Sequence, residues 1–357
     1  MKKIVTVLML LLLLVVAVGM FNQEVLQNSR DYMKDHSVFE AASQLIKKTK
    51  QGTITIENVD VMQEPVRAAE YVVVNESTDE EVALIVTDDN GIGTSKPIPF
   101  GKTYQVIQRS VAHPYQLHDE EVIIDLEEDY ELKIENELLD YVKDVQYTDG
   151  SVEITESHIP VATLMQNPEL PNGCEIVSLT AVLNYYGYDV SKTTMADDFL
   201  PKQPFARQNN KLYGANPYEA YAGEPRDRSG FFVYAPPILQ AAEDFMSTVE
   251  SSHKAVDVSG STREELLEYL KQGIPVVTWM TLELDAPRVT YSWYFHETEE
   301  FFEAPVNLHA TVLNGFIGED KVHVMDPLKG QMVYSAENYF TSYDALGSHA
   351  MILVEDE

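Results

Sequence analysis

The sequence is poor in cysteine and in basic residues. Cys174 is the one cysteine among 357 residues, so no internal disulfide can form, and no Cys/His cluster has the spacing of a zinc site. Only 25 Lys and Arg residues stand against 58 Asp and Glu residues, and the net charge of -33 disfavours nucleic acid as a ligand. The chain is therefore expected to fold by packing alone, without a metal or another cofactor.

The one long hydrophobic run lies at the N-terminus. Two lysines precede an apolar stretch from residue 4 to about residue 21, which is the layout of an export signal. Small residues before Gly19 suit cleavage, but a run of this length also fits an uncleaved membrane anchor. Both alternatives, over residues 1–22, leave the remainder outside the cytoplasm, secreted or on the outer face of the membrane. Residues 23–52 are expected to form a helical linker.

Residues 53–137 contain short segments in which apolar and polar residues alternate. The segments are TITIENV (53–59), AEYVVV (69–74), VALIVT (82–87), TYQVIQRS (103–110), EVIIDL (121–126) and YELKIEN (130–136). Turn-forming residues such as Asp89-Asn90-Gly91 separate them. Alternation of this kind predicts strands with one buried face, and hence a small Ig-like β-sandwich.

The order of these segments resembles the prealbumin-like domains of Gram-positive surface proteins and pilins, of the collagen-adhesin-B type. The resemblance is carried by Asn58-Val59-Asp60, Glu70-Tyr71, residues 86–91, residues 99–104 and Asn136. In that family, a first-strand lysine and a last-strand asparagine can fuse into an isopeptide with help from an acid on a middle strand. Here Asn58 and Gln108 stand at the lysine and acid positions, so no crosslink is expected.

Residues 138–157 are acidic and weakly patterned, and a linker is predicted there before a last domain at 158–357. In this domain Cys174 is expected to open a helix, because turn formers precede it and apolar residues recur every three or four positions after it. The N-terminus of a helix favours a thiolate, which predicts a lowered thiol pKa and a nucleophile. The alternative is that Cys174 is a small buried hydrophobe, as most free cysteines are.

Two residues far downstream favour the nucleophile. His309 opens an apolar segment (309–316), and Asp326 directly follows the next apolar segment (321–325). A helix-borne cysteine, a strand histidine and then an aspartate follow the chain order of papain-like thiol hydrolases, in which the histidine moves the proton and the acid orients its ring. Gln166 is the expected oxyanion donor beside the backbone N–H of Cys174, with Asn172 as its competitor.

The pairing of the two strands leaves alternatives open. A connection over residues 314–321 sets His309 opposite Asp326, whereas a tight turn at 318–321 pairs Asp326 with Leu313. His323 and His349 lie in similar strands and are expected to be structural. The aromatic and Gly/Pro-rich passage at 213–231 is too irregular for a simple connection and is expected to line a site.

Together these motifs resemble the bacteriocin-processing-type cysteine peptidase-like family, the C-39-like peptidases. The motifs are Gln166, residues 171–175, residues 183–187, residues 273–276, His309 and Asp326-Pro327. Residues 213–237 are similar to the exported branch of that family. The resemblance implies an α+β papain-like fold, a triad of Cys174, His309 and Asp326, and Gln166 at the oxyanion hole. Unlike the transporter-linked members that process leader peptides, this sequence has no multi-span region and no GxxxxGK[ST] phosphate-binding loop.

The sequence therefore predicts an exported thiol hydrolase that cleaves peptide or related amide bonds in a peptide or protein substrate. A monomer is expected, with a possible membrane tether through the N-terminal apolar segment. Two alternatives remain: a non-catalytic binding module that kept the fold, and a cell-wall amidase or transpeptidase that uses the same triad.

Overall fold

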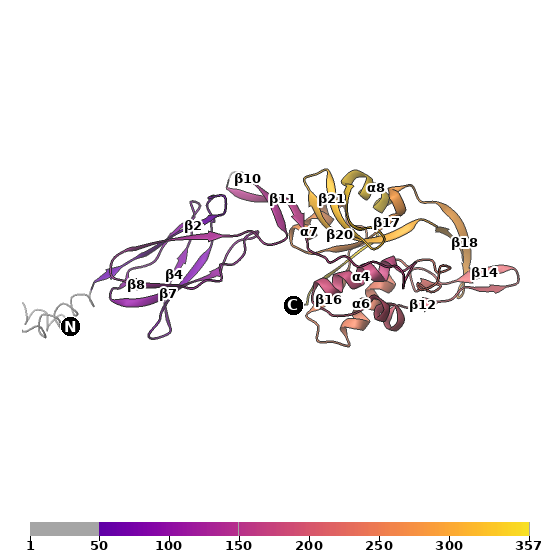
Figure 1. Ribbon diagram of the computed structural model, residues 1–357, viewed down its shortest axis with the longest axis horizontal. Coiled ribbons are helices and arrows are strands. Elements are labelled where there is room, and N and C mark those ends of the chain that lie inside the picture. The colour runs from indigo at the N-terminus through magenta and orange to yellow at the C-terminus, as the bar shows by residue number, and fades with distance from the viewer. Residues whose placement is uncertain (1–49, 149, 357) are drawn as a thin grey trace, which may run out of the picture. The chain divides into compact units, whose positions relative to one another are not determined.

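The computed structural model describes residues 50–148 and 150–356. The predicted export signal and most of the linker at 23–52 lie outside the described residues. Within the described part of the chain, no helix is both long and apolar enough to cross a membrane. Contacts divide the chain into two compact units, Met1–Glu137 and Leu138–Glu357 (Figure 1).

The described part of the first unit is built from strands. They are β1 (Gln51–Gly52), β2 (Ile54–Asp60), β3 (Glu70–Asn75), β4 (Glu80–Val86), β5 (Ile92–Thr94), β6 (Ile98–Pro99), β7 (Lys102–Ser110), β8 (Val122–Leu126) and β9 (Tyr130–Asn136). All six segments expected from alternation lie in strands. A three-stranded sheet, β5-β2-β9, and a four-stranded sheet, β4-β3-β7-β8, turn their apolar residues toward each other.

Buried amides join the two sheets of this unit. Gln108 Nε2 donates to Asn136 Oδ1 at 3.0 Å, and Asn136 Nδ2 donates back to Gln108 Oε1 at 2.9 Å. Gln108 Nε2 also lies 2.9 Å from the hydroxyl oxygen of Tyr71. Asn58 is fully buried on the inward-facing positions of β2. The side chain of Asn136 is therefore held by the neutral amide of Gln108.

The second unit combines strands with five α-helices and two short helical turns in its described residues. Its strands are β10 (Val142–Thr148), β11 (Ser151–His158), β12 (Lys202–Gln203), β13 (Ala206–Gln208), β14 (Lys211–Gly214), β15 (Tyr221–Ala222), β16 (His253–Asp257), β17 (Val276–Thr281), β18 (Val289–Phe295), β19 (Phe301–Pro305), β20 (Leu308–Ile317), β21 (Lys321–Asp326), β22 (Gly330–Ser335) and β23 (Ala350–Glu355). The α-helices are α4 (Cys174–Tyr185), α5 (Lys192–Thr194), α6 (Ala235–Met246), α7 (Arg263–Lys271) and α8 (Ala336–Ala345). A π-helical turn, η1 (Met195–Phe199), and a 3-10 turn, η2 (Leu282–Leu284), complete the set.

The linker predicted at 138–157 is wrong, because this interval holds most of the β10–β11 hairpin. Strand β11 pairs with β20, with His158 opposite Gly315, so the hairpin extends the main sheet of the second unit. The main sheet runs β10-β11-β20-β17-β23-β16, and β21 and β22 continue it beside β20. Most side chains of β10 are exposed at the edge of the sheet, and an edge strand of this kind shows little apolar alternation in its sequence.

Helices cover both faces of the main sheet, with α4 on one side of β17 and β20 and α8 on the other (Figure 1). Neighbouring residues of β17 point to opposite faces of the sheet. Trp279 donates to the carbonyl of Val233 at 2.8 Å, while the hydroxyl of Thr278 is hydrogen-bonded to that of Tyr339 in α8. The first ten residues of α4 are all buried. The recurrence of apolar residues predicted this helix correctly, but over its first ten residues the helix is buried on every side.

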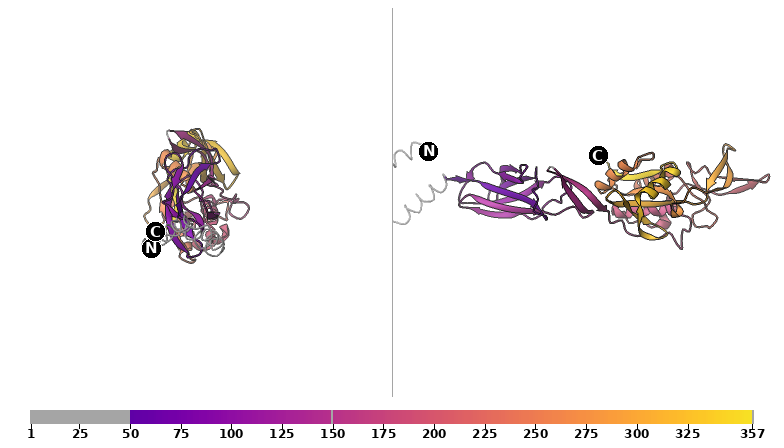
Figure 2. Two further views of the ribbon diagram at one scale, coloured as in Figure 1. Left: turned by 90° about the vertical axis from the view of Figure 1, so that its left-hand side faces the viewer. Right: turned by 90° about the horizontal axis from the view of Figure 1, so that it is seen from above.

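A smaller four-stranded sheet, β13-β14-β18-β19, projects from the body of the second unit (Figure 2). Trp293 of β18 is 1% exposed, and its indole N–H donates to the carbonyl of Ala215 at 2.8 Å. Its ring lies 5.0 Å from that of Phe302 and 5.2 Å from that of Phe231, measured between centroids. These aromatic rings pack together where the small sheet leaves the body of the unit.

Candidate active site

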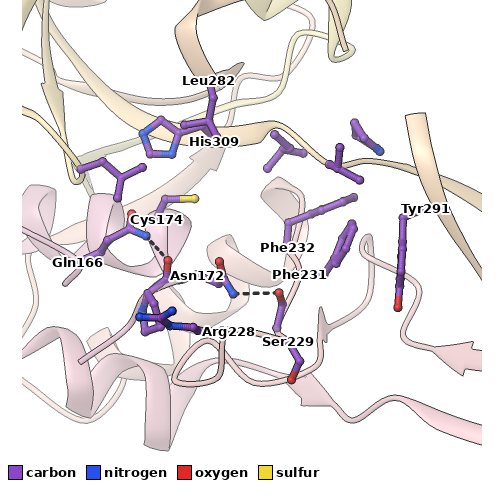
Figure 3. A pocket seen from close by; sticks show the side chains of 16 residues that line it. Gln166, Asn172, Cys174, Arg228, Ser229, Phe231, Phe232, Leu282, Tyr291 and His309 are labelled. Atoms are coloured by element: carbon purple, nitrogen blue, oxygen red, sulfur yellow. Dashed lines mark hydrogen bonds between the residues drawn. The ribbon is translucent and has the colours of Figure 1, made fainter. Parts of the chain in front are cut away.

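A cleft of about 410 Å³ lies at the N-terminus of α4. Cys174 is the first residue of this helix, as predicted, and its side chain lines the cleft together with His309 and Gln166. Figure 3 shows the sulfur of Cys174 below the His309 ring. The structure thus brings the helix and the strand that carry the expected nucleophile and base to one site.

His309 and Asp326 form a buried pair. His309 Nε2 lies 2.8 Å from Asp326 Oδ1, and the two residues are 2% and 0% exposed. The backbone N–H of Leu328 donates to the same carboxylate oxygen at 2.8 Å, and the hydroxyl of Tyr334 donates to Oδ2 at 3.3 Å. Burial raises the pKa of Asp326, but the hydrogen bond and charge of His309 outweigh it, so the pKa lies below its ordinary value. Asp326 is therefore ionised, and it orients the imidazole ring of His309 through the contact with Nε2.

A β-bulge brings these two side chains together. The observed strand pairing matches neither of the two registers expected from the sequence. The hairpin closes with Ile317 opposite Lys321, and the pairing shifts by one residue around Asn314. Beyond the shift Val312 faces Met325, so continued pairing places Asp326 opposite Thr311, on the same face of β20 as His309. Without the extra residue, Asp326 would face Val312 and point to the opposite side of the sheet.

Contacts with β11 hold the bulge in place. The carbonyl of Asn314 accepts a hydrogen bond from the N–H of Ile159 at 2.7 Å, and its side-chain amide donates to the carbonyl of Ile159 at 3.0 Å. A Cβ on Gly315 would stand 2.1 Å from the carbonyl oxygen of Ser157. The β10–β11 hairpin therefore positions the strand pair that carries His309 and Asp326.

The thiol of Cys174 is hydrogen-bonded to a neighbouring carboxyl group. Cys174 Sγ donates to Glu175 Oε2 at 3.2 Å, and Glu175 Oε1 accepts the N–H of Val233 at 3.1 Å. Burial raises the pKa of Glu175 to about 7. Burial also raises the pKa of Cys174 well above its ordinary value, and the charge of Glu175 raises it further, against a weaker opposing contact with the backbone of Ala310. The predicted low thiol pKa is therefore wrong for this state of the site, in which the thiol is protonated.

The two expected oxyanion donors have separate roles. Gln166 is 2% exposed, and one N–H of its side-chain amide donates to the carbonyl of Pro171 at 2.6 Å. The other N–H of this amide makes no hydrogen bond with another described residue, and the backbone N–H of Cys174 lies in the first turn of α4. The amide of Asn172 instead donates to the carbonyls of Asp227 at 2.9 Å and Gly230 at 3.1 Å.

Comparison with known proteins identifies the second unit. The model of the Peptidase_C39 like family matches residues 158–351. The chain belongs to this family. The uncharacterized protein YvpB of Bacillus subtilis is 27% identical over 207 residues, which cover 56% of this chain and 78% of that protein.

Solved structures are similar to parts of the chain. A protein described as a C39-like peptidase from Bacillus anthracis is 29% identical, with a TM-score of 0.48, over 55% of this chain and 96% of that one. The minor pilin GBS52 of Streptococcus agalactiae is 14% identical, with a TM-score of 0.25, over 28% of this chain and 49% of that one.

Two other histidines of the C39-like unit are not among the residues that line the cleft. His323 stacks on His158 with ring centroids 4.4 Å apart, and His349 packs at 4.4 Å from the ring of Tyr234. Burial lowers the pKa of both His323 and His349. Both rings pack against neighbouring rings away from the cleft lining, and their structural role stays a prediction.

Sequence reasoning missed several residues that line the cleft or touch the thiol. Glu175 follows the cysteine directly, but a charged residue in the first turn of a helix is ordinarily a solvated one. Arg228 and Phe231 lie in the irregular passage that was expected to line a site, and they do line the cleft. No pattern in the sequence indicated that Tyr291 of β18 lines the cleft, because only the tertiary structure brings the projecting sheet there.

Proposed function

We propose that this member of the Peptidase_C39 like family is a papain-like thiol hydrolase that cleaves peptide or related amide bonds. Cys174 is the nucleophile, His309 the proton carrier, and Asp326 the residue that orients the histidine. The observation that carries the proposal is the buried hydrogen bond of 2.8 Å between His309 and Asp326, in the cleft that also contains Cys174.

The geometry supports a general-base route from a neutral thiol. Because Nε2 of His309 is directed to Asp326, its Nδ1 is the nitrogen available to take the thiol proton as the sulfur attacks the substrate carbonyl. The C–N bond then breaks, the imidazolium returns its proton to the leaving amine, and a thioester remains. A water molecule attacks the thioester and gives its proton through His309 to the departing sulfur, which restores the thiol. Gln166 and the backbone N–H of Cys174 stabilise the oxyanion in both steps.

The proposal also covers the rest of the chain. The N-terminal hydrophobic run supports an exported or membrane-tethered protein, with the hydrolase outside the cytoplasm. The strand order of the first unit and its amide pair support a prealbumin-like module that acts as a spacer or docking unit. Peptides or proteins are the substrates, and the chain acts as a monomer.

A digest of a defined peptide library by the full chain tests the activity. We expect cleavage by the parent and by His323→Ala, provided that the latter is folded by circular dichroism, and none above background by Cys174→Ala or His309→Ala. Cleavage that survives loss of Cys174 would contradict the nucleophile assignment. Binding of peptides without cleavage would favour the non-catalytic module, and turnover of wall fragments alone would favour the amidase.

A further inference from the structure

The cleft departs from the acidic character of the chain. Of the sixteen described residues that line it, none is Asp or Glu, although the sequence has 58 of them and a net charge of -33. Apart from His309, the one lining residue with an ionisable cationic group is Arg228. A cleft that is lined by no carboxylate side chain and presents a guanidinium is suited to a ligand with negative charge.

Arg228 makes no hydrogen bond or ion pair with another described residue. The contrast with its neighbours is clear: Arg226 pairs with Asp197 through two hydrogen bonds, and Lys202 lies 3.0 Å from Glu224. The guanidinium of Arg228 is therefore free to bind a carboxylate through its two parallel N–H groups.

The loop that carries Arg228 is fixed in position. The side-chain amide of Asn172 holds the carbonyls of Asp227 and Gly230, on either side of Arg228 and Ser229. The carbonyl of Asn172 in turn accepts the hydroxyl of Tyr221 at 2.7 Å, and Tyr221 is fully buried. A short loop held at both ends reduces the ordering needed on binding.

The other side of the cleft is aromatic. Phe231 and Tyr291 stack with ring centroids 5.0 Å apart and planes 23° apart, and buried Trp293 supports Phe231 from behind. Tyr291 is 42% exposed and Val306 is 41% exposed, so apolar surface remains open in the cleft. Figure 3 shows Phe231 and Tyr291 to the right of Cys174, whereas Arg228 lies below Cys174, apart from the aromatic pair. This surface is suited to a large apolar side chain of a ligand.

We infer that the site selects a peptide that carries a bulky apolar side chain and, at a separate position, a carboxylate. Arg228 is the specificity-determining residue for the carboxylate, which either an acidic side chain or a free C-terminus supplies. This inference depends on the proposed hydrolase function for the reaction, but the binding preference follows from the cleft alone.

Paired peptides test the inference on the full chain. Each pair has an aromatic residue at one position and differs only by Glu or Gln at another, and both members are made with free and with amidated C-termini. For the parent we expect kcat/KM to be about 10 to 100 times higher for the carboxylate member, the range of one charge-assisted contact. Arg228→Gln should bring this ratio close to one. Arg207→Gln, which removes an exposed charge from β13, should leave the ratio unchanged.

The two arms of the peptide set identify the source of the carboxylate. A preference that follows Glu over Gln in amidated peptides assigns the side chain, and one that follows the free terminus assigns the α-carboxylate. A parent that cleaves both members of every pair equally, or an Arg228→Gln variant that keeps the full ratio, would overturn the inference and leave the hydrolase function intact.

Binding to a Cys174→Ala chain separates this inference from the proposed reaction. Fluorescence anisotropy with the same labelled peptides measures the preference without any turnover. If no peptide is cleaved by the parent but carboxylate members bind about tenfold or more tightly in an Arg228-dependent way, the hydrolase proposal fails and the recognition stands. Equal binding of the paired peptides would refute the recognition itself.

Discussion

Replacement of Glu175 by glutamine should both stabilise the folded chain at alkaline pH and activate its thiol. Glutamine has nearly the same shape, so its carbonyl can still accept the N–H of Val233 while the amide nitrogen faces the sulfur of Cys174. The substitution removes the carboxylate charge and keeps the packing.

The magnitude for stability follows from the pKa of Glu175. This pKa is raised by burial from an ordinary 4.5 to about 7 in the folded chain, so the folded state binds the proton more tightly between these pH values. The contribution of Glu175 to the free energy of unfolding is fully present below pH 4.5 and is lost as the pH rises through 7. The total loss is about 3 kcal/mol, at 1.36 kcal/mol per pKa unit. Roughly 2.5 kcal/mol of this loss falls between pH 5 and 8.

Denaturant unfolding at pH 5 and at pH 8 measures this term. We expect the free energy of unfolding of the parent to fall by about 2.5 kcal/mol more than that of Glu175→Gln between the two pH values, since all other groups are shared. Glu243→Gln on the exposed side of α6 is the matched control and should follow the parent. An equal pH dependence of parent and Glu175→Gln would show that the carboxyl is not destabilised by burial.

The magnitude for the thiol follows from the removal of a like charge. Burial remains in the variant, but the like charge that opposes ionisation of the thiol is removed, so the pKa of Cys174 should fall in Glu175→Gln. Alkylation by iodoacetamide at pH 8, followed by intact mass, should then be at least about tenfold faster than in the parent. The single cysteine makes the mass change unambiguous. Superimposable pH profiles would refute the role assigned to Glu175.

Three further outcomes are expected. Asp326→Asn should retain at least about ten times the kcat/KM of Asp326→Ala, because two donors contact Oδ1 and keep an amide oxygen toward His309, while the hydroxyl at Oδ2 can rotate to accept; equal activity of the two variants would contradict the orienting role. Gly315→Ala should destabilise the fold by roughly 1 to 3 kcal/mol in denaturant unfolding, since its Cβ meets the carbonyl of Ser157; an unchanged midpoint would contradict the tight contact with β11. The intact mass of the first unit should show no loss of about 17 Da, because an amide pair at Gln108 stands where an isopeptide would need an acid; such a loss would show that the strand alignment is wrong.

Local patterns in the sequence predicted most of the elements and placed Cys174, His309 and Asp326, the three members of the proposed triad, on them. Alternating apolar residues predicted the strands of the first unit, because each strand buries one face. Turn formers before Cys174 predicted the start of α4, and the apolar segment after His309 predicted β20. These signals succeed because a helix start or a half-buried strand is specified by residues that are neighbours in the chain.

The tertiary structure alone decided which side chains meet in the cleft. Asp326 reaches His309 only because the bulge at Asn314 shifts the pairing by one residue, and Ile159, about 155 positions earlier, holds that bulge. Burial likewise turned Glu175 from an ordinary helix-start residue into a carboxyl group with a pKa of about 7 that holds the thiol proton. Register and desolvation depend on contacts between distant segments, so no local pattern in the sequence contains them.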